Sequence, residues 1–235
     1  MAEKKIYYSA SDITNFEICK CHVINKVREK IKGTKLNKRN PTRTELEYQK
    51  QGEVIELSFL SKWLNDQESK PIMGDSLKER IEKTNKAILK GQNYIYQPCL
   101  KFNNLVGYPD LLKKISNGSY EVMDIKRSKE PKKSHVTQIQ TYNFLLTKTL
   151  RYPIHFHIIN GPTHIHNKFR VKDSYDSFIE IKDDFLSYVS KIEKKSETDL
   201  VKLLHEECVY NHSKLPFCET IPNQTDLINV VGLNK

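Results

Sequence analysis

The sequence predicts an α/β domain in which a mixed central β-sheet is flanked by helices. Helical patterns come first, a meander of strand-like runs follows, and helices and strands then alternate towards the C-terminal end. This order is typical of layered α/β folds. Asn117-Gly118, which lies between two apolar runs, is a strong signal for a β-hairpin. The length of 235 residues suits one domain with a small appendage.

The charge balance favours a polyanionic partner. The chain has 39 Lys and Arg against 29 Asp and Glu, a net charge of +10, and 37% apolar residues. Nucleic acid is the commonest polyanion inside cells, although a lysine-rich composition that only keeps the protein in solution gives the same balance. No run approaches the roughly 20 apolar residues of a membrane span, and Met1 to Tyr8 lack the apolar region of a secretory signal. We therefore expect an intracellular protein, in the cytoplasm or nucleus, that does not bind membranes.

Three helical patterns precede the strands. Capping residues at 9–12 open the first pattern, whose apolar positions continue at helical spacing to Val23. A basic loop over 30–44 separates it from a long helix over 44–65, and a shorter helix is expected over 77–90. The apolar stripe of the long helix consists of Ile55, Phe59, Leu60 and Trp63.

The rest of the chain alternates between strand and helix patterns. Runs of apolar and β-branched residues bounded by turn residues indicate strands, and apolar positions three and four apart indicate helices. The tail beyond residue 206 holds two cysteines and a final apolar run. The expected strands cover 94–102, 105–115, 119–127, 153–160 and 164–171, and the expected helices cover 134–150 and 175–192.

The predicted hairpin carries the residues that indicate chemistry. Asp110 lies on its first strand, within Gly107-Tyr108-Pro109-Asp110, and Asp124 and Lys126 lie on its second strand. Because side chains alternate along a strand, Asp124 and Lys126 project from one face, and Asp110 can join them from the neighbouring strand. Carboxylates this close repel each other unless a cation lies between them. The pattern predicts a Mg²⁺ or Mn²⁺ site of oxygen ligands, beside which Lys126 can orient or help deprotonate a water molecule.

Two further groups of residues converge on this patch. Glu56 lies beside the apolar stripe of the long helix and is turned towards the protein, where a shared metal would stabilise its charge. Gln138 and Tyr142 share one face of the next helix and could hold a phosphate or order a neighbouring side chain. Plainer interpretations stay open. Asp124 and Lys126 could lie on a solvated strand face, Glu56 could reach water, and Gln138 and Tyr142 could lie on a helix surface that has no functional role.

Taken together and in this order, these residues resemble the RecB-family nucleases of the PD-(D/E)XK superfamily, which include helicase-associated and CRISPR-adaptation nucleases. The family pattern is a glycine followed four residues later by an acid or a histidine, then G-x-x-D, D-x-K and Q-x-x-x-Y. The matching positions are Gly52 with Glu56, Gly107 to Asp110, Asp124 to Lys126, and Gln138 to Tyr142.

The resemblance extends past the motifs and covers most of the chain. It implies a restriction-endonuclease-like nuclease core over 93–195 and an N-terminal helical part over 1–92 that carries Gly52 and Glu56. A C-terminal cysteine-containing segment over 196–235 would pack on the N-terminal helix as an accessory lobe. The similar segments outside the motifs are Ser11-Asp12-Ile13, Ile95-Tyr96-Gln97, Asp226-Leu227 and Val231-Gly232-Leu233.

The resemblance also implies a role for each residue. Many members carry histidine where this chain has Glu56, so the metal preference could differ. Relatives often carry the module within a larger helicase, so a helicase or another recombination or CRISPR component is an expected partner beside DNA. The implied metal ligands are Glu56, Asp110, Asp124 and the carbonyl of Ile125; Lys126 is the implied catalytic lysine, and Gln138 and Tyr142 are the implied accessory positions near a DNA phosphate.

Five cysteines are too few, and odd in number, for a disulfide scaffold. Many relatives hold an iron–sulfur cluster with one cysteine from the N-terminal helix and three from near the C-terminus. Cys19, Cys208 and Cys218 match that layout, but the third C-terminal cysteine is missing. Cys21 or His212 could replace it and give a site for a cluster or for zinc, or the site has decayed.

The paired histidines and Cys99 receive no metal role. His155 and His157 share one face of a strand, as do His164 and His166, but the apolar residues between the first pair claim the opposite face for the core. We expect these histidines to face solvent or nucleic acid. Cys99 lies within an apolar strand and is expected in the core.

The sequence thus predicts a hydrolase, a Mg²⁺- or Mn²⁺-dependent deoxyribonuclease that cuts without sequence preference and acts on single strands or DNA ends. Tyr7, Tyr8, Tyr94 and Tyr96 could offer stacking faces to a single strand. The alternative is a nucleic-acid-binding or assembly subunit that keeps the fold without turnover. A third hypothesis is a structural protein that depends on zinc or an iron–sulfur cluster.

Overall fold

The computed structural model describes residues 5–33, 41–64, 70–150 and 153–208. Residues 7–10 and 43–179 form one compact unit, and the described residues of 1–6, 11–42 and 180–235 form the other. Within the described ranges, no helix combines the length and the apolarity that crossing a bilayer requires.

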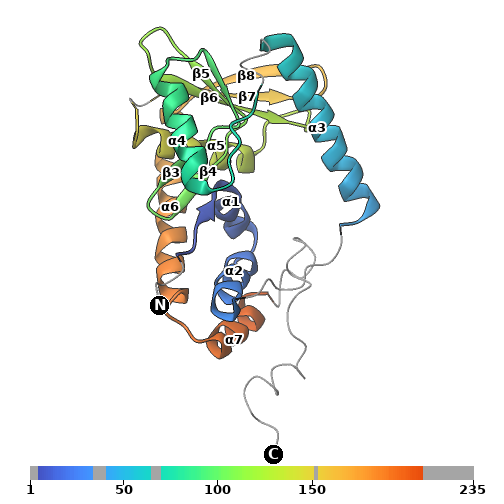
Figure 1. Cartoon of the computed structure of the whole chain (residues 1–235). Coiled ribbons are helices and arrows are strands. Elements are labelled where there is room, and N and C mark those ends of the chain that lie inside the picture. The colour runs from blue at the N-terminus through green and yellow to red at the C-terminus, as the bar shows by residue number, and fades with distance from the viewer. Residues whose placement is uncertain (1–4, 34–40, 65–69, 151–152, 209–235) are drawn as a thin grey trace, which may run out of the picture. The chain divides into compact units, whose positions relative to one another are not determined.

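The larger unit contains a five-stranded mixed sheet, in the order β2-β5-β6-β7-β8 (Figure 1). Strands β6 and β7 run parallel, and every other pair in this sheet is antiparallel. The α/β prediction is therefore confirmed at the level of a mixed sheet with helices. The strands are β2 (Tyr94–Tyr96), β5 (Leu111–Lys114), β6 (Tyr120–Lys126), β7 (His155–Asn160) and β8 (Ile165–Arg170).

A three-stranded mixed sheet of the same unit comprises β1 (Tyr8–Ser9), β4 (Leu105–Gly107) and β3 (Leu100–Phe102), in that order. Strand β1 pairs with β4 in parallel, and β3 pairs with β4 in antiparallel orientation. The sequence did not predict this second sheet.

The strands expected over 94–102 and 105–115 are each broken into two, and their halves belong to different sheets. The first break contains Gln97 in the left-handed region, with a φ of 46°, and the second break covers 108–110. Each break includes a proline, which lacks the N–H that a strand ladder needs. The prediction that Asp110 lies on a strand is therefore wrong, because Asp110 lies in the break just before β5.

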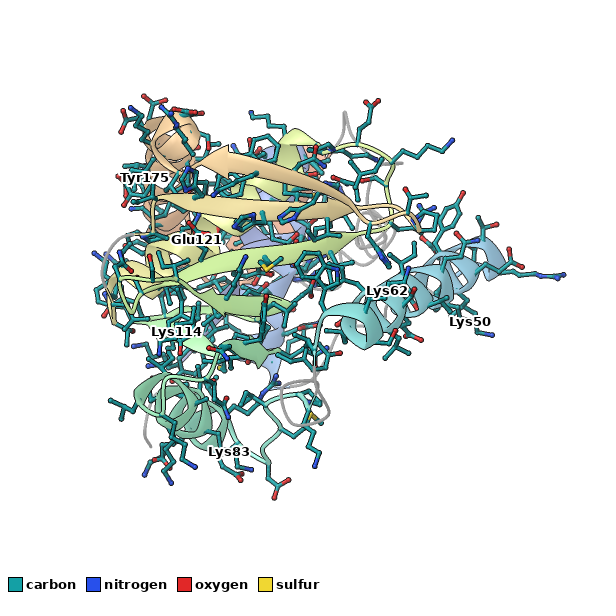
Figure 2. The ribbon with its side chains drawn as sticks, turned by 90° about the horizontal axis from the view of Figure 1, so that it is seen from above. Lys50, Lys62, Lys83, Lys114, Glu121 and Tyr175 are labelled. Atoms are coloured by element: carbon teal, nitrogen blue, oxygen red, sulfur yellow. The ribbon has the colours of Figure 1, made fainter. Side chains whose placement is uncertain are left out.

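Helices cover both faces of the five-stranded sheet. Helix α3 (Arg43–Trp63) packs on β6, and helix α5 (Lys133–Thr147) packs on β6 and on β3 and β4. Met123 of β6 lies in the core that α3 covers, and the side chains of its neighbours along the strand alternate to the face of α5. Figure 2 shows α3, with Lys50 and Lys62 along it, beside the sheet that carries Glu121. The buried residues of the α3-side core are Phe59, Leu60, Tyr96, Leu111, Met123 and Ile159.

Helix α4 (Leu77–Leu89) follows a good N-cap, since the Ser76 side chain accepts a hydrogen bond of 3.1 Å from the backbone N–H of Glu79. Gly91, with a φ of 66°, lies just beyond its last turn. Together with α3 it belongs to the unit of the sheet, whereas the expected boundary fell at residue 92. Helix α6 (Lys172–Ile192) begins in this unit and ends in the other.

The smaller unit is helical. The helix expected to continue to Val23 is two helices, α1 (Ala10–Ile18) and α2 (Cys21–Lys32), and α7 (Glu197–Cys208) packs on α2. Phe16 and Phe185 form an edge-to-face pair with ring centroids 5.4 Å apart. Helix α7 was not predicted, and within the described residues it contributes Glu197, whose carboxylate lies 2.8 Å from the Lys32 ammonium.

Gly107 ends β4 at a point where α5 approaches closely. A Cβ atom at this position would lie 2.7 Å from a ring carbon of Tyr142 and 2.8 Å from Leu145 Cδ1. Such distances are shorter than any normal carbon contact, so α5 or the strand would have to shift. By contrast, nothing lies within 4 Å of a Cβ built on Gly52 in α3.

We expect the Gly107→Ala substitution to lower the free energy of unfolding by about 1–3 kcal/mol, because the added methyl overpacks the contact with α5. The matched change Gly52→Ala should raise it by up to about 1 kcal/mol, because alanine favours a helix interior. Urea unfolding followed by circular dichroism measures both. Equal effects of the two substitutions would contradict the close packing at Gly107.

Candidate active site

The strand register brings two aspartates together. Leu111 of β5 pairs with Met123 of β6 in antiparallel orientation, so the preceding Asp110 lies opposite the following Asp124. The backbone N–H of Ile125 donates a hydrogen bond of 2.6 Å to Asp110 Oδ2. The aspartate in the break is thereby attached to the strand that carries the other predicted residues.

Lys126 is held between β6 and α5. Its ammonium nitrogen lies 2.5 Å from Asp124 Oδ2 and donates a hydrogen bond of 2.9 Å to Gln138 Oε1. The Gln138 side-chain amide in turn donates a 2.8 Å hydrogen bond to the Tyr142 hydroxyl. Gln138 thus contacts Lys126 directly, and Tyr142 contacts Gln138. The role of these two side chains in this structure is to order Lys126.

Glu56 reaches the cluster from α3. The Tyr96 hydroxyl donates a hydrogen bond of 2.9 Å to Glu56 Oε1, and the Gln97 side-chain amide donates another of 3.3 Å. The backbone N–H of Gln97 also donates to the carbonyl of Asp110 at 2.8 Å. The two strand breaks are therefore joined to each other, and the same junction carries Asp110 and the donors that hold Glu56.

Burial raises the pKa of Asp110 well above its ordinary value, and the negative charges of Asp124 and Glu56 raise it further, against the opposing effect of Lys126. Burial lowers the pKa of Lys126, but the charges of Asp124 and Asp110 outweigh it and raise the pKa overall. Lys126 is therefore a stable ammonium group at neutral pH, and its charge stabilises the ionised form of the carboxylates beside it.

Neutral groups complete the site. Burial and the charge of Asp124 raise the pKa of Tyr142 well above its usual range, which keeps its hydroxyl protonated. Burial and the charge of Lys126 lower the pKa of His135 to about 4. The imidazole of His135 is therefore uncharged at pH 7 and accepts a hydrogen bond of 3.2 Å from the backbone N–H of Lys132.

The sequence did not link Tyr96, Gln97 or His135 to the acidic cluster. Tyr96 and Gln97 belong to a segment that resembles the nuclease family, but only the break after β2 directs them to Glu56. His135 lies in the first turn of α5, nine residues after Lys126, and no local spacing pattern links these two positions.

The oxygen donors of the cluster suit a hard divalent cation. Asp110, Asp124 and the carbonyl of Ile125 lie next to each other in the register of β5 and β6. The unequal charge on Asp110, Asp124 and Lys126 also favours an added cation. Among the described residues, however, no three His, Cys, Asp or Glu side chains are arranged to hold a metal ion. The Glu56 carboxylate is held by Tyr96 and Gln97, so a three-carboxylate site would require it to move.

Of the paired histidines, His166 is exposed as expected, whereas His157 is buried and His155 and His164 are half-buried. His157 is only 2% exposed; its Nε2 lies 2.8 Å from Glu121 Oε2, and its Nδ1 lies 2.8 Å from Nε2 of His166. His155 Nδ1 lies 3.2 Å from the other carboxylate oxygen of Glu121. The prediction failed for His157 because its register partner is Met123, so it shares the sheet face that is covered by side chains.

The cysteines can be followed only in part. Cys19 is buried and forms no disulfide, Cys21 is disulfide-bonded, and Cys99 is buried in the core as predicted. The side chain of Cys208 and residues His212 and Cys218 lie outside the described part of the chain. The disulfide removes Cys21 from the candidate ligands, and a cluster or zinc site with Cys19, Cys208, His212 and Cys218 stays a prediction.

Two of the four expected stacking tyrosines are enclosed. Tyr8 is fully buried and Tyr96 is 8% exposed, with its hydroxyl bound to Glu56. Tyr7 is half-buried, and the Lys101 ammonium lies 5.5 Å from its ring centroid. The prediction that Tyr8 and Tyr96 stack on a single strand is wrong, because their rings are part of the core.

We expect Asp110→Asn to raise the free energy of unfolding by about 1 kcal/mol in buffer without divalent metal, because it removes one of the mutually repelling charges. The asparagine oxygen can still accept the hydrogen bond from Ile125. Asp176→Asn, at an exposed position of α6, should change stability by less than about 0.5 kcal/mol. Urea unfolding tests both, and a loss of stability in Asp110→Asn would contradict the electrostatic account.

His157→Leu should lower the free energy of unfolding by about 1–3 kcal/mol, because buried Glu121 loses its nearest partner. Burial lowers the pKa of His157 despite Glu121, and the histidines lower the pKa of Glu121 despite its burial. The folded state therefore binds fewer protons than the unfolded chain, so wild-type stability should be greatest above the ordinary histidine pKa and fall as the pH drops.

Urea unfolding at about pH 8 and at about pH 5 measures how the free energy of unfolding depends on pH. This pH dependence should be weaker in His157→Leu. His166→Leu removes only the exposed end of the hydrogen-bonded series Glu121–His157–His166. It should lower the free energy of unfolding by less than about 1 kcal/mol. A pH profile of His157→Leu parallel to that of the wild type would show that this group does not set the dependence.

Comparisons with known proteins do not identify the chain. No family model matches it, and no curated protein matches it. Among solved structures, the crystal structure of SSO0001 is similar at 12% sequence identity, over 80% of this chain and 79% of that chain, with a TM-score of 0.34. A likeness at this level carries no argument about function, which must come from the site itself.

Proposed function

We propose that this protein is a metal-dependent deoxyribonuclease with a RecB-like PD-(D/E)XK core. The observation that carries the proposal is the junction of Asp110, Asp124 and Lys126, in which Asp110 is tied to the Ile125 N–H and Lys126 contacts Asp124. Acidic oxygens beside a buried, oriented ammonium group are the donor set that phosphodiester hydrolysis needs. The four motifs that resemble the nuclease family include all of these residues.

Asp110, Asp124 and the carbonyl of Ile125 would bind Mg²⁺ or Mn²⁺, and Glu56 would join them after leaving Tyr96 and Gln97. When bound, such an ion supplies Lewis acidity and lowers the pKa of a coordinated water. It would also offset the repulsion that raises the pKa of Asp110.

Lys126 supplies positive charge to the reacting phosphate. Its raised pKa means that it remains an ammonium group and does not serve as the base in this state. Its bonds to Asp124 and Gln138 fix its direction, and Tyr142 fixes Gln138 in turn. The ammonium can therefore stabilise charge that develops on a phosphate oxygen without reorganising first.

The substrate preference follows from charge. A net charge of +10 attracts a phosphate backbone irrespective of sequence. The proposed reaction is therefore sequence-nonspecific hydrolysis of DNA, at single strands or ends. A helicase or another recombination or CRISPR component is the proposed partner, since relatives of the motif pattern often act within such assemblies.

The second candidate is a nucleic-acid-binding or assembly subunit without turnover. Its support is that the side chains of the cluster are already engaged: Lys126 with Asp124, and Glu56 with Tyr96 and Gln97. If these contacts persist when divalent metal is present, the carboxylates are not free to coordinate it.

A cleavage assay with labelled single- and double-stranded DNA separates these functions. With Mg²⁺ or Mn²⁺, the wild type should cut DNA, and Asp110→Ala and Lys126→Ala should each lower the rate by at least about 100-fold because each removes charge from the reacting centre. Lys168→Ala, at an exposed lysine of β8, is the matched control and should retain activity.

DNA binding by each variant, measured by fluorescence anisotropy in EDTA, shows that loss of cutting is not loss of folding. Wild-type protein that binds DNA and never cuts it with either metal would favour the assembly subunit. Cutting by Lys126→Ala at the wild-type rate would remove the lysine from the mechanism.

A further inference from the structure

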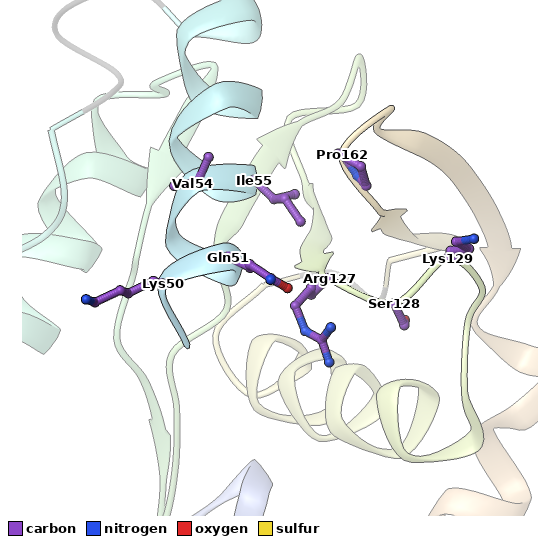
Figure 3. Close-up of a pocket in the computed structure, with 8 residues that line it drawn as sticks. All are labelled: Lys50, Gln51, Val54, Ile55, Arg127, Ser128, Lys129 and Pro162. Atoms are coloured by element: carbon purple, nitrogen blue, oxygen red, sulfur yellow. The ribbon is translucent and has the colours of Figure 1, made fainter. Parts of the chain in front are cut away.

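A pocket of about 540 Å³ lies next to the candidate active site. Helix α3 forms one wall, the segment after β6 forms the second, and the turn between β7 and β8 forms the third (Figure 3). Its volume is in the range of sites that enclose a small organic group. Gln51, Val54, Ile55, Arg127, Lys129 and Pro162 are among the residues that line it.

The chain connects this pocket directly to the candidate active site. Ile55 lies in the pocket wall and precedes Glu56; Arg127 lies in the opposite wall and follows Lys126. β6 ends at Lys126 and Arg127 follows it directly; consecutive Cα atoms lie about 3.8 Å apart, so the two positions are within the reach of neighbouring groups on one polymer. A strand of nucleic acid bound at the Lys126 end of β6 would therefore need to extend by only a short distance to reach this pocket.

The walls are apolar and the rim is cationic. Val54 is 65% exposed and, with Ile55 and Pro162, offers an apolar surface. Arg127 and Lys129 supply positive charge, and the described residues that line the pocket include no carboxylate. Figure 3 shows Ile55 and Gln51 directed from α3 towards the segment of Arg127.

Arg127 also provides a flat stacking group. Its guanidinium carbon lies 4.0 Å from the ring centroid of Tyr48, which is exposed on α3. A guanidinium plane supported by an aromatic ring is a platform on which a nucleobase can stack, while the positive charge attracts the neighbouring phosphate. This pair offers the stacking surface that the buried Tyr8 and Tyr96 cannot.

We propose that the pocket receives one unpaired base of a DNA single strand, whose backbone continues to Asp110, Asp124 and Lys126. The inference rests on the proposed nuclease function and specifies its substrate as single-stranded at this position. Paired bases are stacked within the duplex and cannot enter a concave site. The cationic rim without carboxylates favours a polyanion over a peptide as the occupant.

Binding without catalysis is the direct test. Fluorescence anisotropy in EDTA compares a labelled single strand, a hairpin duplex of the same composition, and the same strand with abasic positions. The wild type should bind the single strand at least about 10-fold more tightly than the duplex or the abasic strand, since stacking of one base contributes about 1–3 kcal/mol.

Two pocket variants have matched controls on α3. Val54→Asp places a carboxylate in the apolar wall and should weaken single-strand binding about 10-fold, whereas Leu57→Asp, at a residue that is 62% exposed and outside the pocket, should have a smaller effect. Arg127→Gln should make the negative slope of log K against log salt shallower by about 0.7, the value for one phosphate contact on a single strand. Lys62→Gln is its control.

The outcomes separate this inference from the nuclease proposal. Equal binding of normal and abasic strands, tighter binding of the duplex, or equal effects of Val54→Asp and Leu57→Asp would overturn the base pocket, even if the protein cuts DNA. The expected binding pattern in a protein that cuts nothing would support the pocket and reject the nuclease.

Discussion

The electrostatic imbalance around Lys126 is the constraint on which the rest of the site depends. One ammonium group faces Asp124 directly and Asp110 through space, with the charge of Glu56 nearby. Isolated ions of this kind are costly to bury. The arrangement persists because apolar packing beneath it, from Phe59 and Met123 among others, stabilises the sheet independently of the charges. The unfavourable electrostatics are therefore confined to one edge of a well-packed fold.

The junction of the two sheets explains how the acidic groups meet. Both chain breaks occur where the polypeptide passes from one sheet to the other, and the hydrogen bond from Gln97 N–H to the Asp110 carbonyl fixes them together. If the strand continued through Asp110, the backbone of Asp110 would form the hydrogen bonds of a strand ladder. The direction of the Asp110 side chain would then follow from strand alternation alone. The break instead lets the Asp110 side chain accept the Ile125 N–H. The irregular segment is thus the element that gives the site its geometry.

Local periodicity predicted those parts of the site that lie on regular elements. Alternation on β6 placed Asp124 and Lys126 together, and the four-residue spacing placed Gln138 beside Tyr142; both arrangements occur in the structure. The break at Asp110 could not be predicted in this way, because it depends on which sheet each half-strand joins. The burial of His157 was also missed, since a period of two identifies a shared face but does not say whether that face is covered. These failures concern tertiary contacts, which no short window of sequence encodes.

Under the two proposals, the end of β6 would divide two tasks between adjacent residues. Lys126 is directed to Asp124 and to α5, whereas the next residue, Arg127, stacks on Tyr48 of α3. Lys126 is enclosed by partners that fix its position, as a group near reacting atoms must be. Arg127 is exposed and lies over the Tyr48 ring, an arrangement that would suit the proposed stacking contact with a base of any kind. Because neighbouring side chains at a strand end point to different sides, precise positioning and tolerant recognition can lie one residue apart without competing for the same space.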